Sequence, residues 1–161
     1  MRTSLTFDRT KQRALPIWLA ILVALLIVAR IVASKYPVTS DVDLVHWTDS
    51  EVASAMSMRL HRPILYEFSA EWCGPCHALE REVFMDPDLA ATINRRFIAV
   101  KVVDRQREDG HNPSSVQQLM DRYGVTGFPT VVIAESNGSA RDRTVGYFGR
   151  DKFEKFIDPE H

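Results

Sequence analysis

Both cysteines of the chain lie in one short run, Trp-Cys-Gly-Pro-Cys, at positions 72–76. The aliphatic and aromatic residues at 63–68 predict a short strand before this run, and the apolar spacing over 78–84 predicts a helix after it. At such a turn the first sulfur lies at a helix N-terminus, where free N–H groups and the helix dipole stabilise a thiolate. The second sulfur, almost one turn further on, can attack a mixed disulfide formed by the first. The pattern therefore predicts thiol–disulfide exchange by Cys73 and Cys76.

The composition and charge of the chain argue against several classes of protein. The 161 residues carry a formal net charge of −1, which gives no indication of a nucleic-acid partner. Two cysteines cannot form a disulfide-stapled scaffold, so the core must hold by packing. A structural zinc site needs four ligands, and the chain offers one cysteine pair and scattered histidines. We therefore expect no metal and no cofactor beyond a redox-active disulfide between Cys73 and Cys76.

The N-terminal region predicts a membrane anchor. Residues 1–14 are polar and basic, and residues 15–29 carry no charge. With the apolar residues that follow, this run predicts a transmembrane helix over 15–33, near whose end Arg30 reaches the interface. Basic residues before the span and acids after it predict a single-pass plasma-membrane protein with a cytoplasmic N-terminus and an extracytoplasmic domain, periplasmic in a Gram-negative cell. A cleaved signal peptide ending near Val32-Ala33-Ser34 is the alternative, and it places the cysteines on the same side.

After a linker at 34–45, the pattern predicts one α/β domain over 46–161. Thr48 to Glu51 fit a capping box at the start of a helix. The later elements are expected as a short helix at 88–96, a central strand at 97–103, a charged loop at 104–112, a helix at 113–123, strands at 130–134 and 143–147 joined by a turn at 136–139, and a helix at 152–157. This order predicts a mixed sheet of four to five strands with helices on both faces.

The element order and three motifs resemble thioredoxin over roughly residues 46–159. The motifs are Trp72-Cys73-Gly74-Pro75-Cys76, the acid Glu67 six residues before the first cysteine, and Gly127-Phe128-Pro129-Thr130. The run from Glu80 to Pro87 is similar to the C-terminal thioredoxin-like domain of DsbD, where a Glu…Phe…Asp-Pro run follows the redox helix. The resemblance implies a thioredoxin-like three-layer α/β fold.

The resemblance also implies roles for individual residues. Cys73 and Cys76 would be the catalytic pair, and Glu67 a buried acid that moves a proton to or from Cys76. The peptide bond before Pro129 would be cis, which leaves a backbone edge free for a substrate segment. The residues implied to bind substrate are Trp72, Gly74, Pro75, Phe128 and Pro129. An exposed strand position for Glu67 and an ordinary strand start at Pro129 are the alternatives.

Three departures from thioredoxin lie around this acid. Thioredoxin has an aspartate in place of Glu67, and its partner lysine aligns here with Val100. Lys101 is therefore expected to point to the opposite face of the sheet from Glu67. Arg81 replaces the proline that kinks the redox helix of thioredoxin.

These observations predict an extracytoplasmic, membrane-tethered disulfide reductase. The Gly-Pro pair between the cysteines resembles reducing thioredoxins, whereas oxidants of that family favour Pro-His. Its expected partners are protein disulfide substrates and a DsbD-like membrane protein that supplies electrons. The alternative is a binding module without turnover that docks a client, or that carries a metal on Cys73, Cys76 and His77 or haem on the same Cys-x-x-Cys-His run.

Overall fold

The computed structural model describes residues 17–35 and 43–159, which belong to two compact units. The first unit contributes a single helix, α1 (Ile17–Lys35), whose 19 residues include Arg30. Across the two described ranges, no helix has the length and apolar character needed to cross a membrane. The predicted transmembrane helix over 15–33 is therefore not supported by the structure. The predicted segment 1–14 and most of the predicted linker lie outside the described residues.

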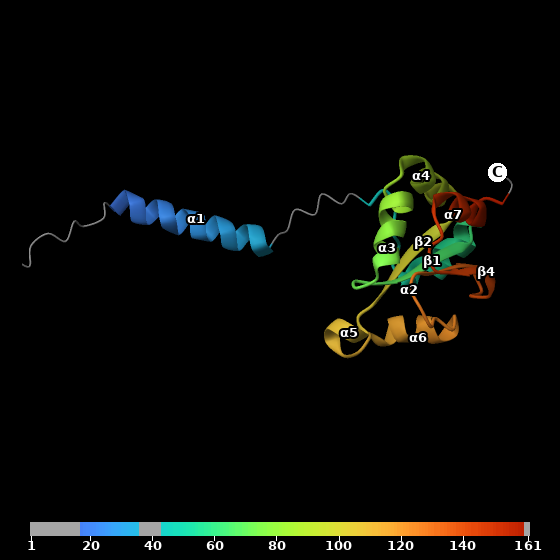
Figure 1. Ribbon diagram of the computed structural model, residues 1–161. Helices are drawn as coiled ribbons and strands as arrows, with labels where there is room; N and C mark the ends of the chain where they lie inside the picture. Colours follow the sequence, from blue (N-terminus) through green and yellow to red (C-terminus); the bar gives the residue numbers. More distant parts are fainter. Residues whose placement is uncertain (1–16, 36–42, 160–161) are drawn as a thin grey trace, which may run out of the picture. The chain divides into compact units, whose positions relative to one another are not determined.

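A mixed four-stranded sheet forms the middle layer of the second unit, as predicted (Figure 1). Its strands are β1 (Ile64–Ala70), β2 (Ile98–Asp104), β3 (Thr130–Ala134) and β4 (Ala140–Val145). The spatial order is β2-β1-β3-β4, in which β1 runs parallel to β2 and antiparallel to β3, and β4 runs antiparallel to β3. This arrangement places the end of β1 between β2 and β3, directly before the cysteine motif.

Helices cover both faces of the sheet. The helices are α2 (Ser50–Leu60), α3 (Gly74–Leu79), the π-helical turn η1 (Glu80–Phe84), α4 (Pro87–Arg96), α6 (Ser114–Arg122) and α7 (Arg150–Ile157). Side chains of α3, η1, α4 and α7 pack with one face of the sheet, and those of α2 and α6 with the other. Figure 1 shows α4 and α7 on one side of the sheet and α6 on the opposite side. The expected three-layer fold is thus confirmed.

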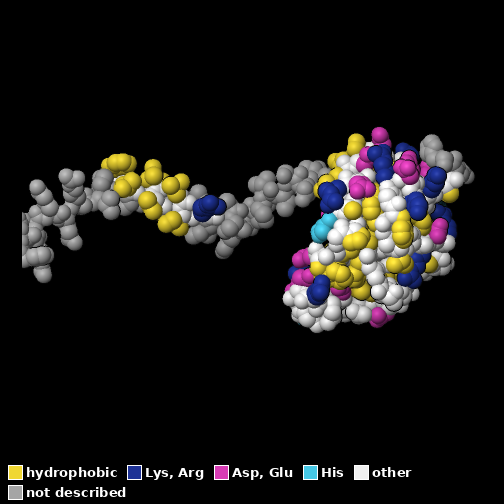
Figure 2. Space-filling model, viewed as in Figure 1, with side chains coloured by type: hydrophobic (Ala, Val, Ile, Leu, Met, Phe, Trp, Pro, Cys, Tyr) yellow, Lys and Arg dark blue, Asp and Glu magenta, His cyan; other side chains and the backbone are white. Residues whose placement is uncertain are grey.

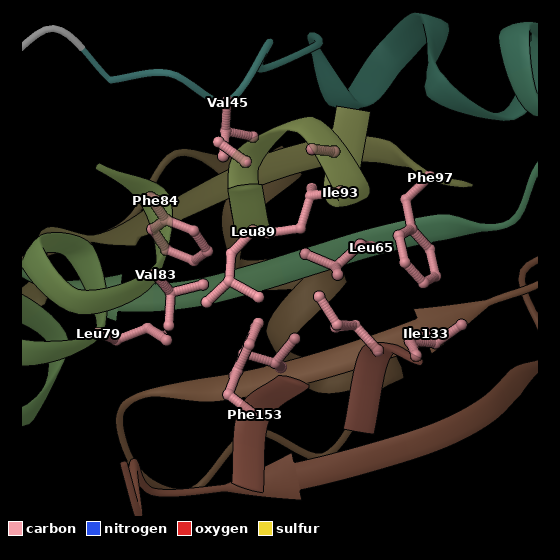
Figure 3. Packing of buried hydrophobic residues seen from close by; sticks show 14 residues of the cluster. Val45, Leu65, Leu79, Val83, Phe84, Leu89, Ile93, Phe97, Ile133 and Phe153 are labelled. Carbon is pink, nitrogen blue, oxygen red and sulfur yellow. The ribbon is translucent and has the colours of Figure 1, made fainter. Parts of the chain in front are cut away.

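The larger of the two cores lies under α3, η1, α4 and α7. Figure 3 shows Phe84, Leu89 and Phe153 from these helices against Leu65 and Ile133 from the sheet. All five side chains are buried. Removing such side chains from water is the main force that orders the domain, at about 25 cal/mol per Å² of apolar surface. This core fixes the redox helix against the sheet.

Strand β1 is central and buried on both faces. Every one of its seven residues is buried, including Glu67 and Ser69. A strand covered by helices on both sides needs a nearly continuous apolar run, because neither face meets water. A carboxylate in such a strand is costly to bury. Glu67 is therefore a candidate for function.

Strand β2 was predicted to be central, and this prediction is wrong, because β2 forms one edge of the sheet. Its continuous apolar run reflects helices on both faces and gives no information about its neighbours along the sheet. The outer side of β2 is partly covered by the chain before α2. Trp47 forms a parallel bridge with Ala99, and the backbone N–H of Thr48 donates to the carbonyl of Ala99 at 2.7 Å.

Aspartates cap two of the helices. Asp49, rather than the predicted Thr48, is the N-cap of α2, and its side chain accepts from the backbone N–H of Glu51. The capping box is shifted because Asp49 is itself a strong N-cap residue and lies one position nearer the helix. Asp86 caps α4 and accepts from the N–H groups of Asp88 and Leu89 at 3.1 and 2.9 Å. Pro87 follows at the first position of that helix, where no N–H is required.

Two segments differ from their predicted form. The region 104–112, predicted as a loop, contains the short helix α5 (Gln106–Asp109), which ends at Gly110 in a left-handed conformation. Strand β4 starts at Ala140 rather than at the predicted 143, immediately after the predicted turn, in which Gly138 has a φ of 83°. Short polar segments of this kind carry little periodicity, so their bounds follow from their surroundings.

Candidate redox site

The two cysteines form a disulfide at the start of α3. Their sulfurs are bonded and their Cα atoms lie 5.3 Å apart. Cys73 is the N-cap of the helix, and its Sγ accepts a hydrogen bond from the backbone N–H of Cys76 at 3.2 Å. Gly74 and Pro75 form the first helical turn between them. Because helix N-termini stabilise negative charge, this geometry favours a thiolate on Cys73 when the disulfide is reduced.

Exposure does not distinguish the two cysteines in the disulfide form. The exposed fraction of Cys73 is 3%, against 6% for Cys76. Both are buried in this state because the bonded cysteines pack with Ala70 and against Phe128. The difference between the cysteines therefore lies in their position on the helix and not in their access to solvent.

A second loop closes over the disulfide from the end of α6. The peptide bond between Phe128 and Pro129 is cis, as the resemblance implied. Phe128 packs against the cysteines, and its ring meets that of Trp72 edge-on at a centroid distance of 5.9 Å. Trp72 is 49% exposed, whereas Pro129 is buried. An exposed aromatic side chain beside a reactive pair is suited to contact with a partner protein.

Glu67 lies at the buried centre of β1, on the same face of the sheet as α3. Its exposed fraction is 1%, and the hydroxyl of Ser69 donates to its Oε2 at 3.0 Å. Burial raises the pKa of Glu67 from 4.5 to about 7, although the charge of Lys101 and the Ser69 hydrogen bond lower it. A carboxyl group whose pKa lies near neutral pH can both accept and release a proton under physiological conditions.

Lys101 faces Glu67, which corrects the expectation that it points to the other face. In the parallel register of β1 and β2, Glu67 is the partner of Lys101, and partners in register lie on the same face. The Nζ of Lys101 lies 2.7 Å from Oε1 of Glu80 and 3.6 Å from Oδ2 of Asp43. It also lies 5.5 Å from the ring centroid of Trp47. The alignment with thioredoxin failed because it fixes residue identity without fixing strand register.

Glu67 and Cys76 line the same cavity. This space of about 200 Å³ is also bordered by Ser69, Glu80 and Lys101. A cavity of this size has room for more than one water molecule, since one needs roughly 10–15 Å³ by the same kind of measure. The cavity therefore offers room for water beside the carboxyl group of Glu67 and the second cysteine.

The redox helix changes its winding where thioredoxin has a proline. After Leu79 the backbone passes into the π-helical turn η1, which contains Arg81. A π-helical turn adds a residue to the helix and alters its direction without proline. Glu80, at the start of this turn, forms the ion pair with Lys101. Sequence reasoning did not single out Glu80 as an acid of the site, because its partner is known only once the register of β2 is known.

His77 does not join the cysteines in a ligand group. The imidazole Nε2 lies 2.9 Å from the carbonyl oxygen of Glu71, and the side chain is exposed. Within residues 17–35 and 43–159, no group of three or more His, Cys, Asp or Glu side chains is placed to hold a metal ion.

Comparisons with known proteins agree with this geometry. The family model of the thioredoxin-like domain matches residues 51–159. The thiol:disulfide interchange protein DsbD of Photorhabdus laumondii is 23% identical over 109 residues, which make up 66% of this chain and 18% of that protein. The chain thus matches less than one fifth of the length of this relative.

Two solved structures share the fold. A thioredoxin from Thermus thermophilus has a TM-score of 0.59 and 25% identity, and the match covers 71% of this chain and 85% of that one. The oxidised C-terminal domain of DsbD from Neisseria meningitidis has a TM-score of 0.55 and 23% identity, and the match covers 73% of this chain and all of that domain. The family match includes Glu67, both cysteines and Pro129. The chain therefore belongs to the thioredoxin-like family and carries Cys73–Cys76 as its cysteine pair.

Proposed function

We propose that this protein is a thiol–disulfide oxidoreductase that reduces disulfide bonds in other proteins. The observation that carries the proposal is the joint position of three groups. Cys73 caps the redox helix, Cys76 lies one turn further on, and Glu67, with a pKa of about 7, borders the same cavity as Cys76. An attacking sulfur, a resolving sulfur and a proton acceptor are the parts that disulfide exchange requires.

The reaction transfers two electrons from the cysteine pair to the substrate. The Cys73 thiolate attacks one sulfur of the substrate disulfide, and the other substrate sulfur leaves as a thiolate that takes up a proton. Glu67 then accepts the proton of the Cys76 thiol, and the Cys76 thiolate attacks Sγ of Cys73. The substrate leaves with its second thiolate, which is protonated in turn. The substrate has become a dithiol and the protein a Cys73–Cys76 disulfide.

The docking of a substrate segment uses the surface around the disulfide. The aromatic rings of Trp72 and Phe128 contact the segment, and the backbone beside Pro129 pairs with it as an added strand. Gly74 and Pro75 have no bulky side chains, so they allow the partner to approach the sulfur of Cys73. These roles are supported by the packing of Trp72 and Phe128 around the cysteines.

The reducing direction rests on the Gly74-Pro75 pair and needs a dithiol donor to regenerate the cysteines. A DsbD-like membrane protein is the proposed donor. The reduction potential of the Cys73–Cys76 pair tests the direction. We expect a value near that of thioredoxin, about −270 mV, and a value near −120 mV would indicate an oxidant instead.

Substitution of each cysteine tests the mechanism. Cys76→Ser should attack clients and fail to release them, so that mixed disulfides accumulate on non-reducing gels. Cys73→Ser should trap almost no client, and both variants should fail to reduce insulin. Trapping by Cys73→Ser but not by Cys76→Ser would show that the attacking sulfur is Cys76. A Soret band in the purified protein, without trapping by either variant, would favour the haem-binding alternative.

We also propose that the domain works outside the cytoplasm. The support is the sequence pattern of a basic start followed by the uncharged run 15–29. In reduced spheroplasts, a membrane-impermeant maleimide should label Cys73 and Cys76 of the intact chain. Labelling that requires lysis would contradict this location.

A further inference from the structure

The short helix α5 belongs to a segment that is fixed beside the redox site. We define the α5 segment as residues 105–112. The backbone N–H of Arg105 donates to Oδ1 of Asn112 at 2.7 Å, and the Asn112 amide donates to Oδ1 of Asp104 at 2.6 Å. The Arg105 guanidinium lies 2.6 Å from Oε1 of Glu71, the residue before Trp72. The segment is thus tied both to the end of β2 and to the start of the cysteine motif.

Arg107 of this segment lies over the indole ring of Trp72. The guanidinium carbon is 4.7 Å from the ring centroid, which is within the range of a cation–π contact. The side chain is exposed. Within residues 17–35 and 43–159, no carboxylate lies at ion-pair distance from Arg107. Its positive charge is therefore held against Trp72 and faces solvent.

Two other cations near the disulfide, Arg105 and Lys101, are already paired. Arg105 binds both Glu71 and Asp109, and Lys101 binds Glu80. Glu108 follows Arg107 on α5, but adjacent residues of a helix project in different directions. Figure 2 shows one face of the domain, on which hydrophobic side chains gather and both basic and acidic side chains lie around them. Arg107 is thus a basic group available to a bound partner beside Trp72.

A docked substrate brings its own residues within reach of this guanidinium. Trp72 is the neighbour of Cys73 in the chain, so consecutive Cα atoms are about 3.8 Å apart. An extended substrate segment advances about 3.3 Å per residue from the cysteine that bonds to Cys73. Residues two or three positions from that cysteine therefore lie about 7 to 10 Å away, over the side chains that flank the disulfide.

We propose that Arg107 is a specificity-determining residue that favours disulfide partners with an acidic side chain two or three residues from the reacting cysteine. The proposal rests on the disulfide-reducing function proposed above and adds the chemistry of the preferred partner. A guanidinium held flat on an aromatic ring keeps its outward N–H groups for a carboxylate, which it can bind with two parallel hydrogen bonds. Docking also removes water from the pair, which strengthens the attraction.

The test compares two peptide disulfides that differ only in charge. Each is a disulfide-linked dimer of a short peptide with cysteine at its start and either two aspartates or two lysines at the second and third following positions. The dithiol form of the full chain is mixed with each peptide, and release of peptide thiol is followed at low salt. An exposed ion pair changes binding by a factor of up to about five, so we expect the acidic peptide to react about three to ten times faster for two charges. The difference should shrink at high salt.

Variants of Arg107 assign the preference to this side chain. Arg107→Glu should reverse the preference, Arg107→Gln should remove it, and Arg107→Lys should keep most of it. Arg59→Glu makes the same charge change near the C-terminal end of α2, at the opposite end of β1, and should leave the preference unchanged. Equal rates for the two peptides with the unmodified chain would overturn the inference.

A small neutral disulfide separates this inference from the function on which it rests. Bis(2-hydroxyethyl) disulfide has no charge for Arg107 to recognise, so all of these variants should reduce it at the same rate. If Arg107→Glu slows this reaction as much as that of the acidic peptide, Arg107 acts on the cysteines and not on the partner, and the inference is wrong. If the unmodified chain reduces neither this compound nor the peptides, the proposed function fails as well.

Discussion

Burial of the Glu67 carboxyl links the stability of the domain to pH. Its pKa rises from 4.5 to about 7 on folding, chiefly because the group is removed from water. The folded state therefore keeps a proton that the unfolded chain has already lost between these values. Stability is full below about pH 4.5 and falls as the pH rises through about 7. The total fall corresponds to roughly 3 kcal/mol.

Replacing Glu67 by glutamine should remove this penalty. At pH 8 the disulfide form of Glu67→Gln should be more stable than the parent by up to about 3 kcal/mol, and at pH 4 the two should be similar. Urea denaturation at a series of pH values measures the difference. Glu108→Gln changes an exposed carboxylate and serves as the control, with no comparable gain. A gain of equal size for Glu67→Gln at pH 4 and pH 8 would mean that packing and not ionisation is responsible.

Lys101 should set the pH at which Glu67 acts in disulfide reduction. Its charge lowers the pKa of Glu67, so Lys101→Met should move the Glu67 ionisation in the pH–rate profile of insulin reduction to higher pH. Glu67→Gln should lose that ionisation and react more slowly near neutral pH. If Lys101→Met leaves the profile unchanged while Glu67→Gln alters it, the ion pair with Glu80 already offsets the effect of the lysine charge on the pKa of Glu67.

At this scale the sequence predicted the cysteine pair but not its surroundings. The pairing of Cys73 with Cys76 followed from one motif and its spacing, whereas Glu67 was singled out through the resemblance to thioredoxin. The burial of Glu67 could be argued only through the resemblance, because alternation is uninformative in a strand buried on both faces. The placement of Lys101 opposite Glu67 depends on the register of β1 and β2, which the alternation of residues within β2 does not provide.

Among the elements, the junction between the redox helix and α4 depends on Asp86. Its side chain caps α4, and its Oδ2 also lies 2.7 Å from the guanidinium of Arg150 on α7. Asp86→Ala should lower the free energy of unfolding by about 1 kcal/mol, since two N–H groups lose their acceptor. Asp86→Asn keeps the cap and loses the ion pair, so it should cost much less. Equal losses in urea denaturation would indicate that the contact with Arg150 matters more than the cap.

Strong hydrophobic periodicity and turn residues predicted most elements, whereas short elements without a distinct hydrophobic pattern were not predicted. Strand β3 occupies the predicted residues 130–134, because its apolar run is bounded by Pro129 and by the turn that contains Gly138. Helix α5 has four residues and no buried side chain, so it leaves no hydrophobic pattern to detect. The π-helical turn η1 was equally invisible, since its five residues fit ordinary helical spacing.

For the whole molecule, the chain before α2 is part of the fold. Val45 is buried in the larger core, and residues 43–45 had been assigned to the linker by their composition. The backbone N–H of His46 donates to Oδ1 of Asn94 at 2.8 Å, and the Asn94 amide donates to the carbonyl of Leu44 at the same distance. Trp47 donates its indole N–H to Asp43. These contacts hold the segment 43–48 along the outer edge of β2.

Removing this segment should expose the edge of β2. A chain that starts at residue 49 leaves unpaired backbone groups on a strand whose residues are largely apolar, and such edges pair with other chains. We expect this chain to self-associate in light scattering, whereas a chain that starts at residue 41 should remain monodisperse. If both are equally monodisperse, helices and side chains already shield β2.

The bridge between Trp47 and Ala99 determines where the domain can be cut for use in a fusion protein. The family match begins at residue 51, inside α2, so a domain boundary drawn there removes the segment 43–48 that lies along the edge of β2. Within this segment, Asp43 forms an ion pair with Lys101, the cation that faces Glu67, and the ring of Trp47 lies under the same ammonium group. A fusion protein or sensor built from residues 51–159 alone would therefore keep the two cysteines, but the pKa of its Glu67 would differ. A segment that keeps the surroundings of Glu67 must therefore begin no later than Asp43.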